Sequence, residues 1–159
     1  MKPRSTDVRP KGEEWITESL MLEQKLVELI REDARYPYEA YEFLCEAVSY
    51  TQDLLERSPR EEDDPDTDYH VSGAELLRGA CDLAVQEFGM MAPVVFRLWN
   101  IRRTDDLGNI VFNLIRGERL SKSERDEPED FHELFDLEKA LTESFEMTTV
   151  PRTPAKGAR

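Results

Sequence analysis

Residues 72–89 read SGAELLRGACDLAVQEFG, and this stretch carries the clearest local signal in the chain. Ser72 can accept a hydrogen bond at a helix start, and Glu75 three residues later can bond back, which is the pattern of a capping box. Apolar residues then recur three and four positions apart, as one buried face of a helix requires. Gly89 stands where a helix commonly ends in a conformation that favours glycine. The stretch therefore predicts a helix that begins at Ser72 and ends at Gly89.

Two more helices are expected upstream of this one. The first runs from about Trp15 to Ala34, and the second from Pro37, a favoured first helical position, to about Arg57. The apolar residues expected on the buried face of the first helix are Ile16, Leu20, Leu22, Leu26, Val27, Leu29 and Ile30. Those of the second helix are Ala40, Tyr41, Phe43, Leu44, Ala47, Val48, Leu54 and Leu55. Both sets recur at the helical period, so both faces are expected to pack into one core.

Downstream, Pro93 can open a short helix, and Thr104 can cap a longer one. The segment that follows allows two interpretations: a loop and one more helix that starts near Asp136, or a small β-hairpin that pairs 120–122 with 131–135. The chain is thus predicted to be mainly α, with a compact multi-helix domain of about five to six helices. With the hairpin, its C-terminal half would have the element order of a winged helix.

The length of 159 residues predicts a single folded domain. Residues 14–146 are expected to form that domain, and the acidic stretch 61–69 within it is expected to be a solvated loop. Residues 1–13 and 147–159 contain prolines, glycines and basic residues with few large apolar ones. We therefore expect both ends to be disordered tails.

The net charge of −14 is unevenly distributed along the chain. Residues 1–12 and 150–159 each carry +3, so residues 13–149 carry −20. Such a body repels phosphate backbones and anionic lipid surfaces. Acidic residues also occupy the proposed wing and the start of the helix that would approach bases. A winged-helix nucleic-acid binder is therefore only a second, disfavoured alternative, and nucleic acid is not expected as a partner.

Neither a signal peptide nor a membrane span is expected. The N-terminal basic residues are followed by no apolar segment, and no stretch approaches ~18 consecutive apolar residues. Cys45 and Cys81 both fall inside apolar helical patterns and do not resemble a disulfide framework. We therefore expect a cytoplasmic protein with no membrane partner.

Two histidines are the weak candidates for a chemical site. Asp66, Asp68 and His70 could hold a cation, but their spacing matches neither an EF-hand loop nor a zinc site. His132 is flanked by carboxylates and could act as a base, although the sequence places no nucleophile or pocket beside it. A packed His70 and a surface His132 are the favoured interpretations, and no metal or cofactor is expected. The alternative is an enzyme with a non-standard carboxylate and histidine site, or a metal-dependent one, near 66–75.

Aromatic and basic residues supply the candidate interaction surface. Tyrosines anchor interfaces because they combine a large ring with a polar tip, but they are equally ordinary as half-buried helix residues. Arg102 and Arg103 lie between two predicted helices and could bind a carboxylate partner; a solvated turn is the competing interpretation. The tyrosines in this surface are Tyr36, Tyr38, Tyr41 and Tyr50.

Three stretches resemble a known family: RYPYEAYEFLCEAVSYT at 35–51, the segment from HVSGAELL to DLGNIVFNLI at 70–115, and LSKSERDEPEDF at 120–131. They are similar to a small uncharacterised family restricted to Planctomycetes, Verrucomicrobia and their relatives. The resemblance covers roughly residues 25–145, and its most specific pieces are H-V-S-G-x-E-L-L and D-L-G-x-I-V-F-N-L-I. It implies a bacterial cytosolic protein. It implies no activity, so no functional residues are carried over.

The sequence contains no motif for a nucleotide cradle, a nucleophile elbow or a metal-binding helix. The aromatic second helix and the acidic body favour contact with proteins. We therefore expect a non-catalytic protein–protein interaction or regulatory module whose partner is another protein or a second copy of this chain.

Overall fold

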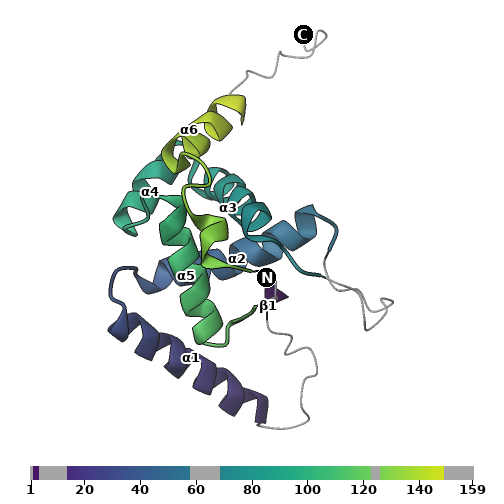
Figure 1. Cartoon of the computed structure of the whole chain (residues 1–159), viewed down its shortest axis with the longest axis vertical. Helices are drawn as coiled ribbons and strands as arrows, with labels where there is room; N and C mark the ends of the chain where they lie inside the picture. Colours follow the sequence, from purple (N-terminus) through teal and green to yellow (C-terminus); the bar gives the residue numbers. More distant parts are fainter. Residues whose placement is uncertain (1, 4–13, 58–68, 123–125, 149–159) are drawn as a thin grey trace, which may run out of the picture.

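The computed structural model describes residues 2–3, 14–57, 69–122 and 126–148. Within these ranges the chain is mainly α, as predicted, and its helices pack into one compact body (Figure 1). The α-helices are α1 (Glu14–Glu32), α2 (Tyr38–Leu54), α3 (Gly73–Phe88), α4 (Ala92–Leu98), α5 (Thr104–Arg116) and α6 (Leu137–Thr148). The shorter elements are the 3-10 turns η1 (Gly89–Met91) and η2 (Pro128–Phe131) and the strands β1 (Lys2–Pro3) and β2 (Leu120–Ser121).

Helix α3 forms the centre of the fold and packs against α2, α4, α5 and α6. Its predicted capping box is confirmed: the Glu75 amide donates to Ser72 Oγ at 3.2 Å, and the Ser72 amide donates to Glu75 Oε2 at 2.9 Å. Gly89 ends the helix with a φ of 55°, a backbone conformation that favours glycine. The chain turns at this glycine into η1 and α4, so the end of α3 determines where α4 begins.

Helices α2 and α3 approach closely at one glycine. A Cβ atom at Gly79 would lie 1.9 Å from Oγ1 of Thr51, so no larger residue fits without movement of one helix. The Thr51 hydroxyl is itself held in place, because it donates a 2.6 Å hydrogen bond to the Ala47 carbonyl. The two helices therefore share a close contact that brings the apolar residues of α2 into the core.

Helix α1 lies at the edge of the bundle (Figure 1). Leu26 and Leu29 are buried, but Leu20 and Val27, which were expected on its buried face, are exposed. The expected stripe is thus too wide, because a peripheral helix has neighbours on a narrower arc than its apolar residues cover. Polar contacts hold the rest of α1 to the end of α5 and the residues after it. They are Lys25 with Glu118, Arg116 with Glu32, and Arg119 with Glu23.

Of the two interpretations of the segment after α5, the hairpin between 120–122 and 131–135 is wrong, and the further helix that starts near Asp136 is confirmed by α6. In the described part of the chain, β2 pairs antiparallel with β1, so that Lys2 lies opposite Ser121 and Pro3 opposite Leu120. The residues expected as the second hairpin strand instead begin within η2. Phe131 fixes the position of this segment. Its ring is buried against α3 and α5, where Gly73 and Gly108 leave room for it. The winged-helix interpretation therefore lacks its wing among the described residues.

Several expected boundaries differ from those observed. Lys2 and Pro3 were expected in the N-terminal tail and form β1, while α6 continues to Thr148, beyond the expected end of the domain at 146. The remainder of both expected tails, and 61–68 of the expected acidic loop, lie outside the described residues. Thr104 was expected to cap α5 and is instead its first residue.

We expect Gly79→Ala to lower the free energy of unfolding by about 1–3 kcal/mol, because the new methyl group overlaps the Thr51 hydroxyl. Chemical denaturation followed by circular dichroism measures this change. Arg78→Ala, at an exposed position on the same helix, should change stability by less than about 0.5 kcal/mol. Thr51→Ala should recover part of the loss in the double variant, and simple additivity of the two substitutions would contradict the contact.

Candidate protein-docking site on α4

Four aromatic rings hold α4 in place. The Phe43 ring centroid lies 5.6 Å from that of Phe96 and 5.4 Å from that of Trp99, and Phe88 meets Trp99 edge to face at 5.8 Å. Such pairs contribute about 0.5–1.5 kcal/mol each beyond the apolar area that they bury. These rings come from α2, from the end of α3, from α4 and from Trp99 directly after it, so they fix a helix that is too short to be stable alone.

The opposite side of α4 is apolar and exposed. Leu98 is 77% exposed and Met90 69%, and Met91 and Val94 are also exposed. We call these four residues of η1 and α4 the α4 face. Exposed apolar residues that occur singly are ordinary on a protein surface, but a group on adjoining ordered elements is typical of a binding site.

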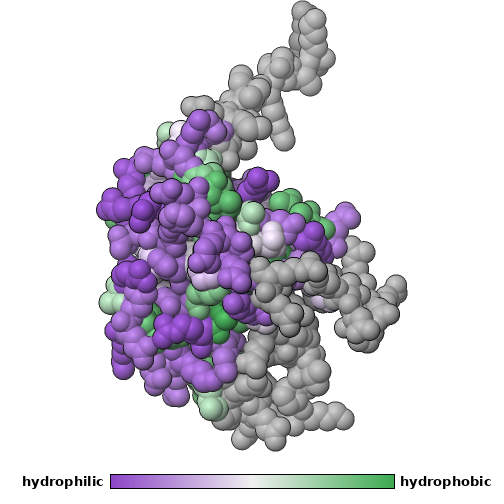
Figure 2. Space-filling view, in the orientation of Figure 1, coloured by the Kyte–Doolittle hydropathy of each residue, from purple (hydrophilic) through white to green (hydrophobic). Residues whose placement is uncertain are grey.

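The exposed apolar residues of α1 differ from those of the α4 face in their surroundings. Leu20, Met21 and Val27 alternate along α1 with acidic residues, for example Glu23 and Glu28. The view in Figure 2 likewise shows a mainly hydrophilic surface interrupted by separate hydrophobic areas. The α4 face has no acidic residue among its neighbours in sequence.

Residues 88–104 contain three arginines and no acidic residue, which is the longest acid-free stretch of the sequence. The arginines are Arg97 on α4 and Arg102 and Arg103 in the connection to α5, and all three are exposed. The amides of Arg102 and Arg103 donate to Asp106 Oδ2 at 2.9 and 3.0 Å, which fixes the backbone of this connection. This stretch thus carries three positive charges in a chain whose net charge is −14, and one of the three, Arg97, is paired with Glu138 of α6.

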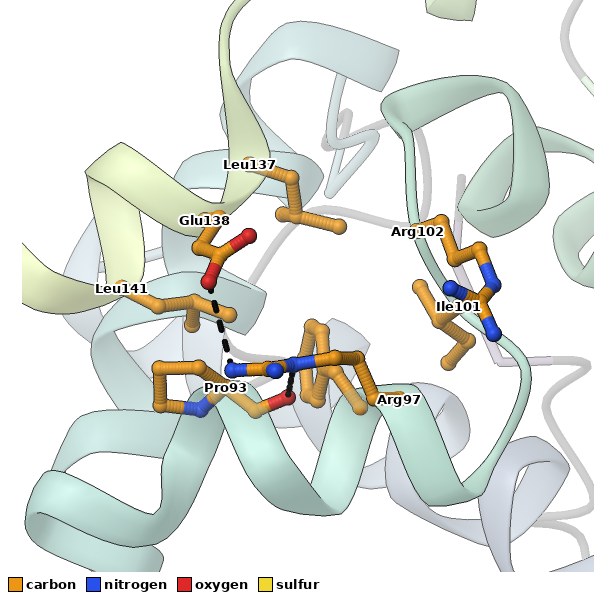
Figure 3. Close-up of a pocket in the computed structure, with 8 residues that line it drawn as sticks. Pro93, Arg97, Ile101, Arg102, Leu137, Glu138 and Leu141 are labelled. Atoms are coloured by element: carbon orange, nitrogen blue, oxygen red, sulfur yellow. Dashed lines mark hydrogen bonds and ion pairs between the residues drawn. The ribbon is translucent and has the colours of Figure 1, made fainter.

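A small hollow lies beside the α4 face, between α4 and the start of α6 (Figure 3). Its volume of about 90 Å³ is well below the roughly 300–1,000 Å³ of sites for small-molecule ligands. Arg97 crosses one side of the hollow, donating to the Pro93 carbonyl at 3.3 Å and to Glu138 Oε1 at 3.2 Å. Two arginines, Arg97 and Arg102, line this small hollow together with apolar residues. It is lined by Pro93, Phe96, Arg97, Ile101, Arg102, Leu137, Glu138 and Leu141.

His70 is a packed residue in this structure. Its Nε2 lies 3.2 Å from Oδ1 of Asp126, which is buried, so the two side chains join the start of α3 to the segment before η2. Arg57 binds both the His70 carbonyl, at 3.1 Å, and the Glu75 carboxylate, at 2.8 Å. Asp66 and Asp68, the other members of the predicted cation site, lie outside the described residues. Among the residues that are described, no group of three or more His, Cys, Asp or Glu side chains could hold a metal ion.

His132 lies on the surface and contacts the start of α5. Its Nδ1 is 2.6 Å from Oδ1 of Asp105, whose other oxygen accepts a 3.1 Å hydrogen bond from the Glu133 amide. The hydrogen bond to Asp105 raises the pKa of His132, and the same bond lowers the pKa of Asp105. The pair ties the η2–α6 connection to α5.

The four candidate tyrosines divide between the core and the polar surface. Tyr36 and Tyr41 are buried, and their hydroxyls bond Asp106 and Asn113, so in this fold they cannot present an interaction surface. Burial raises the pKa of Tyr36 to about 12. Tyr38 and Tyr50 are half-buried, and their hydroxyls donate to Glu23 and Asp82. The core interpretation is confirmed for Tyr36 and Tyr41, and the interface interpretation of Tyr38 and Tyr50 stays a prediction.

The thiols offer no activated nucleophile. Burial raises the pKa of Cys81 to about 12, and burial is also the main cause of the raised pKa of Cys45, although Arg119 acts in the opposite direction. A thiol with a raised pKa is protonated at neutral pH and reacts slowly.

Sequence reasoning found Arg102 and Arg103 but missed the α4 face and the hollow. Nearly every residue of 91–99 is apolar, so periodicity alone does not indicate which side of the short helix is exposed. The apolar run at 91–99 could still have indicated a binding surface, because a helix that is apolar on all sides needs partners on all sides. The absence of acidic residues from 88 to 104 was a second signal.

We expect the imidazole of His132 to titrate above its ordinary pKa of 6.5 in an NMR titration of the native protein. Because the folded-state pKa is raised, the contact stabilises the fold fully below pH 6.5, and this contribution is lost as the pH rises through the folded-state value. Asp105→Asn should return the pKa toward 6.5. An unshifted His132 in the native chain, or a shift that survives Asp105→Asn, would contradict the contact.

Within the described residues, no helix is both long enough and apolar enough to span a bilayer. Comparisons of the chain with protein-family models, with curated proteins and with solved structures found no match. The resemblance to a bacterial family therefore stays a prediction, and the function has to be argued from the site itself.

Proposed function

We propose that this chain is a non-catalytic protein-interaction or regulatory module and that the α4 face is its docking surface. The observation that carries this proposal is an ordered helix whose outer side is apolar and exposed, with Leu98 at 77% and Met90 at 69%. Apolar area that is exposed to water is unfavourable, and a partner that covers it lowers the free energy of the complex.

The aromatic packing that holds α4 in place favours the binding of a partner to the α4 face. The rings of Phe43, Phe96 and Trp99 hold α4 before any partner arrives, so little backbone order has to be gained on binding. Two of the four exposed residues are methionines, whose flexible side chains adapt to the shape of a partner. A fixed helix with adaptable side chains is suited to recognising another protein.

The alternative, an enzyme or metal-dependent site near 66–75, gains no support from the contacts of His70. Its Nε2 bonds a buried carboxylate, Asp126, and the nearby Glu75 is bound by Arg57 and by the Ser72 amide. These contacts suit a structural junction at the start of α3.

Site-specific crosslinking in the native host tests the proposed function. A photoreactive amino acid at position 98 should give a defined adduct with a protein, because Leu98 is the most exposed residue of the α4 face. The same group at Leu54, which is 60% exposed at the end of α2, is the matched control and should give none. The adduct at position 98 should disappear when Met91→Ser is added.

Equal crosslinking at positions 54 and 98, or no adduct at position 98, would overturn the proposal. Mass spectrometry of the adduct then distinguishes another protein from a second copy of this chain. Met91→Ser should leave the thermal unfolding midpoint almost unchanged, since the side chain is exposed. That control separates loss of contact from loss of fold.

A further inference from the structure

We propose that the α4 face and the adjoining hollow receive an acidic, amphipathic segment of a partner protein. In this arrangement, one apolar side chain of the segment enters the hollow, further apolar residues cover the α4 face, and carboxylates bind Arg97 and Arg102. The inference rests on the proposed function and adds the chemistry of the partner to it.

The hollow and the α4 face are neighbours around one helix. Each residue of an α-helix turns by about 100°, so Pro93 and Arg97, which line the hollow, are followed around α4 by Val94 and Leu98 of the face. Arg97 lies between the two surfaces, and Figure 3 shows its side chain directed toward Glu138. A segment that crosses α4 would therefore contact an apolar strip, a guanidinium and the hollow in succession.

The charges of this region select a partner with carboxylates. Among the residues that line the hollow, Arg97 and Arg102 outnumber the one carboxylate, Glu138, which disfavours a basic segment. Arg102 is exposed. A guanidinium binds a carboxylate through two parallel hydrogen bonds, which supplies orientation as well as attraction. The rest of the body is strongly negative, so the acidic residues of the partner must be confined to the segment that docks.

The existing contact of Arg97 is one that a partner can replace. Arg97 and Glu138 are 53% and 67% exposed at their side chains, and their 3.2 Å ion pair is a surface pair. Such pairs contribute only about 0–1 kcal/mol. A carboxylate of the docked segment can therefore take the place of Glu138, and loss of the Glu138 charge should assist docking.

A second copy of this chain fits the site less well than a different protein. In a symmetric dimer through the α4 face, the same three arginines of both copies would lie against one another. The acidic stretch 61–68 of another copy supplies carboxylates but contains no large apolar residue for the hollow. The segment that docks must carry both carboxylates and a large apolar residue.

Peptide selection provides the test, because it does not presuppose the partner. A displayed library of random peptides is selected on the full chain and counter-selected on a Met91→Ser, Leu98→Ser double variant. The enriched peptides should combine Asp or Glu with Leu, Ile or Phe at helical or alternating spacing. The enriched peptide is then labelled, and its affinity is measured by fluorescence polarisation for a set of variants.

We expect Arg102→Gln to weaken binding roughly fivefold and Leu98→Ser at least tenfold. Glu138→Gln should tighten binding roughly two- to fivefold, because it frees Arg97 for the peptide. Arg78→Gln, which removes the same charge from an exposed position of α3, is the matched control and should change affinity by less than about twofold. If Glu138 had only a structural role, Glu138→Gln would not tighten peptide binding.

Several outcomes would overturn the proposal. They are enrichment of basic peptides, no enrichment that depends on Leu98, or unchanged affinity in Arg102→Gln and Glu138→Gln. Anionic vesicles and duplex DNA are titrated in the same assay, and binding of either that Leu98→Ser abolishes would assign the surface to that partner instead. If crosslinking at position 98 succeeds while the selection yields basic peptides, the docking function stands and the acidic chemistry fails. If both fail, the docking function fails as well.

Discussion

The packing of Phe96 and Trp99 against Phe43 and Phe88 is the contact on which the proposed site depends. Helix α4 has too few residues to be stable in isolation, and the turn at Gly89 only sets where it begins. The aromatic rings bury its inner side and leave the other side in solvent. Without that anchor the exposed methionines and Leu98 would belong to a mobile segment, and a partner would have to order it at a cost in conformational entropy.

Residues 88–104 also differ from the rest of the chain in charge. Residues 13–149 carry a net charge of −20. The stretch 88–104 departs from this pattern, with arginines beside apolar residues and a hollow the size of one side chain. A surface that differs from the rest of the molecule in charge, hydropathy and shape at once is more specific than any one of these features alone.

The elements that could be predicted from the sequence are those set by local contacts. Ser72, Glu75 and Gly89 define α3 through bonds within a few residues, and the helical period identified the other helices. The pairing of Leu120 with Pro3 could not be predicted, because it joins residues that lie 117 positions apart in the sequence. Nor could periodicity show that Val27 is exposed or that Tyr36, which precedes α2, is buried, since these outcomes depend on which neighbours each segment acquires. Arg102 and Arg103 were found as candidates, whereas their setting beside an exposed apolar helix required the fold.

The most direct test of this account is a solution measurement of order and exposure on α4 in the free protein. Native-state hydrogen exchange should show protected amides at Trp99 and Ile101, which bond the carbonyls of Val95 and Phe96 at 3.0 and 2.8 Å. A soluble paramagnetic probe should at the same time broaden the methyl signals of Met90, Met91, Val94 and Leu98, because water reaches them. Amides that exchange at the rate of an unfolded chain, or methyl signals that the probe does not reach, would contradict a fixed and uncovered docking surface.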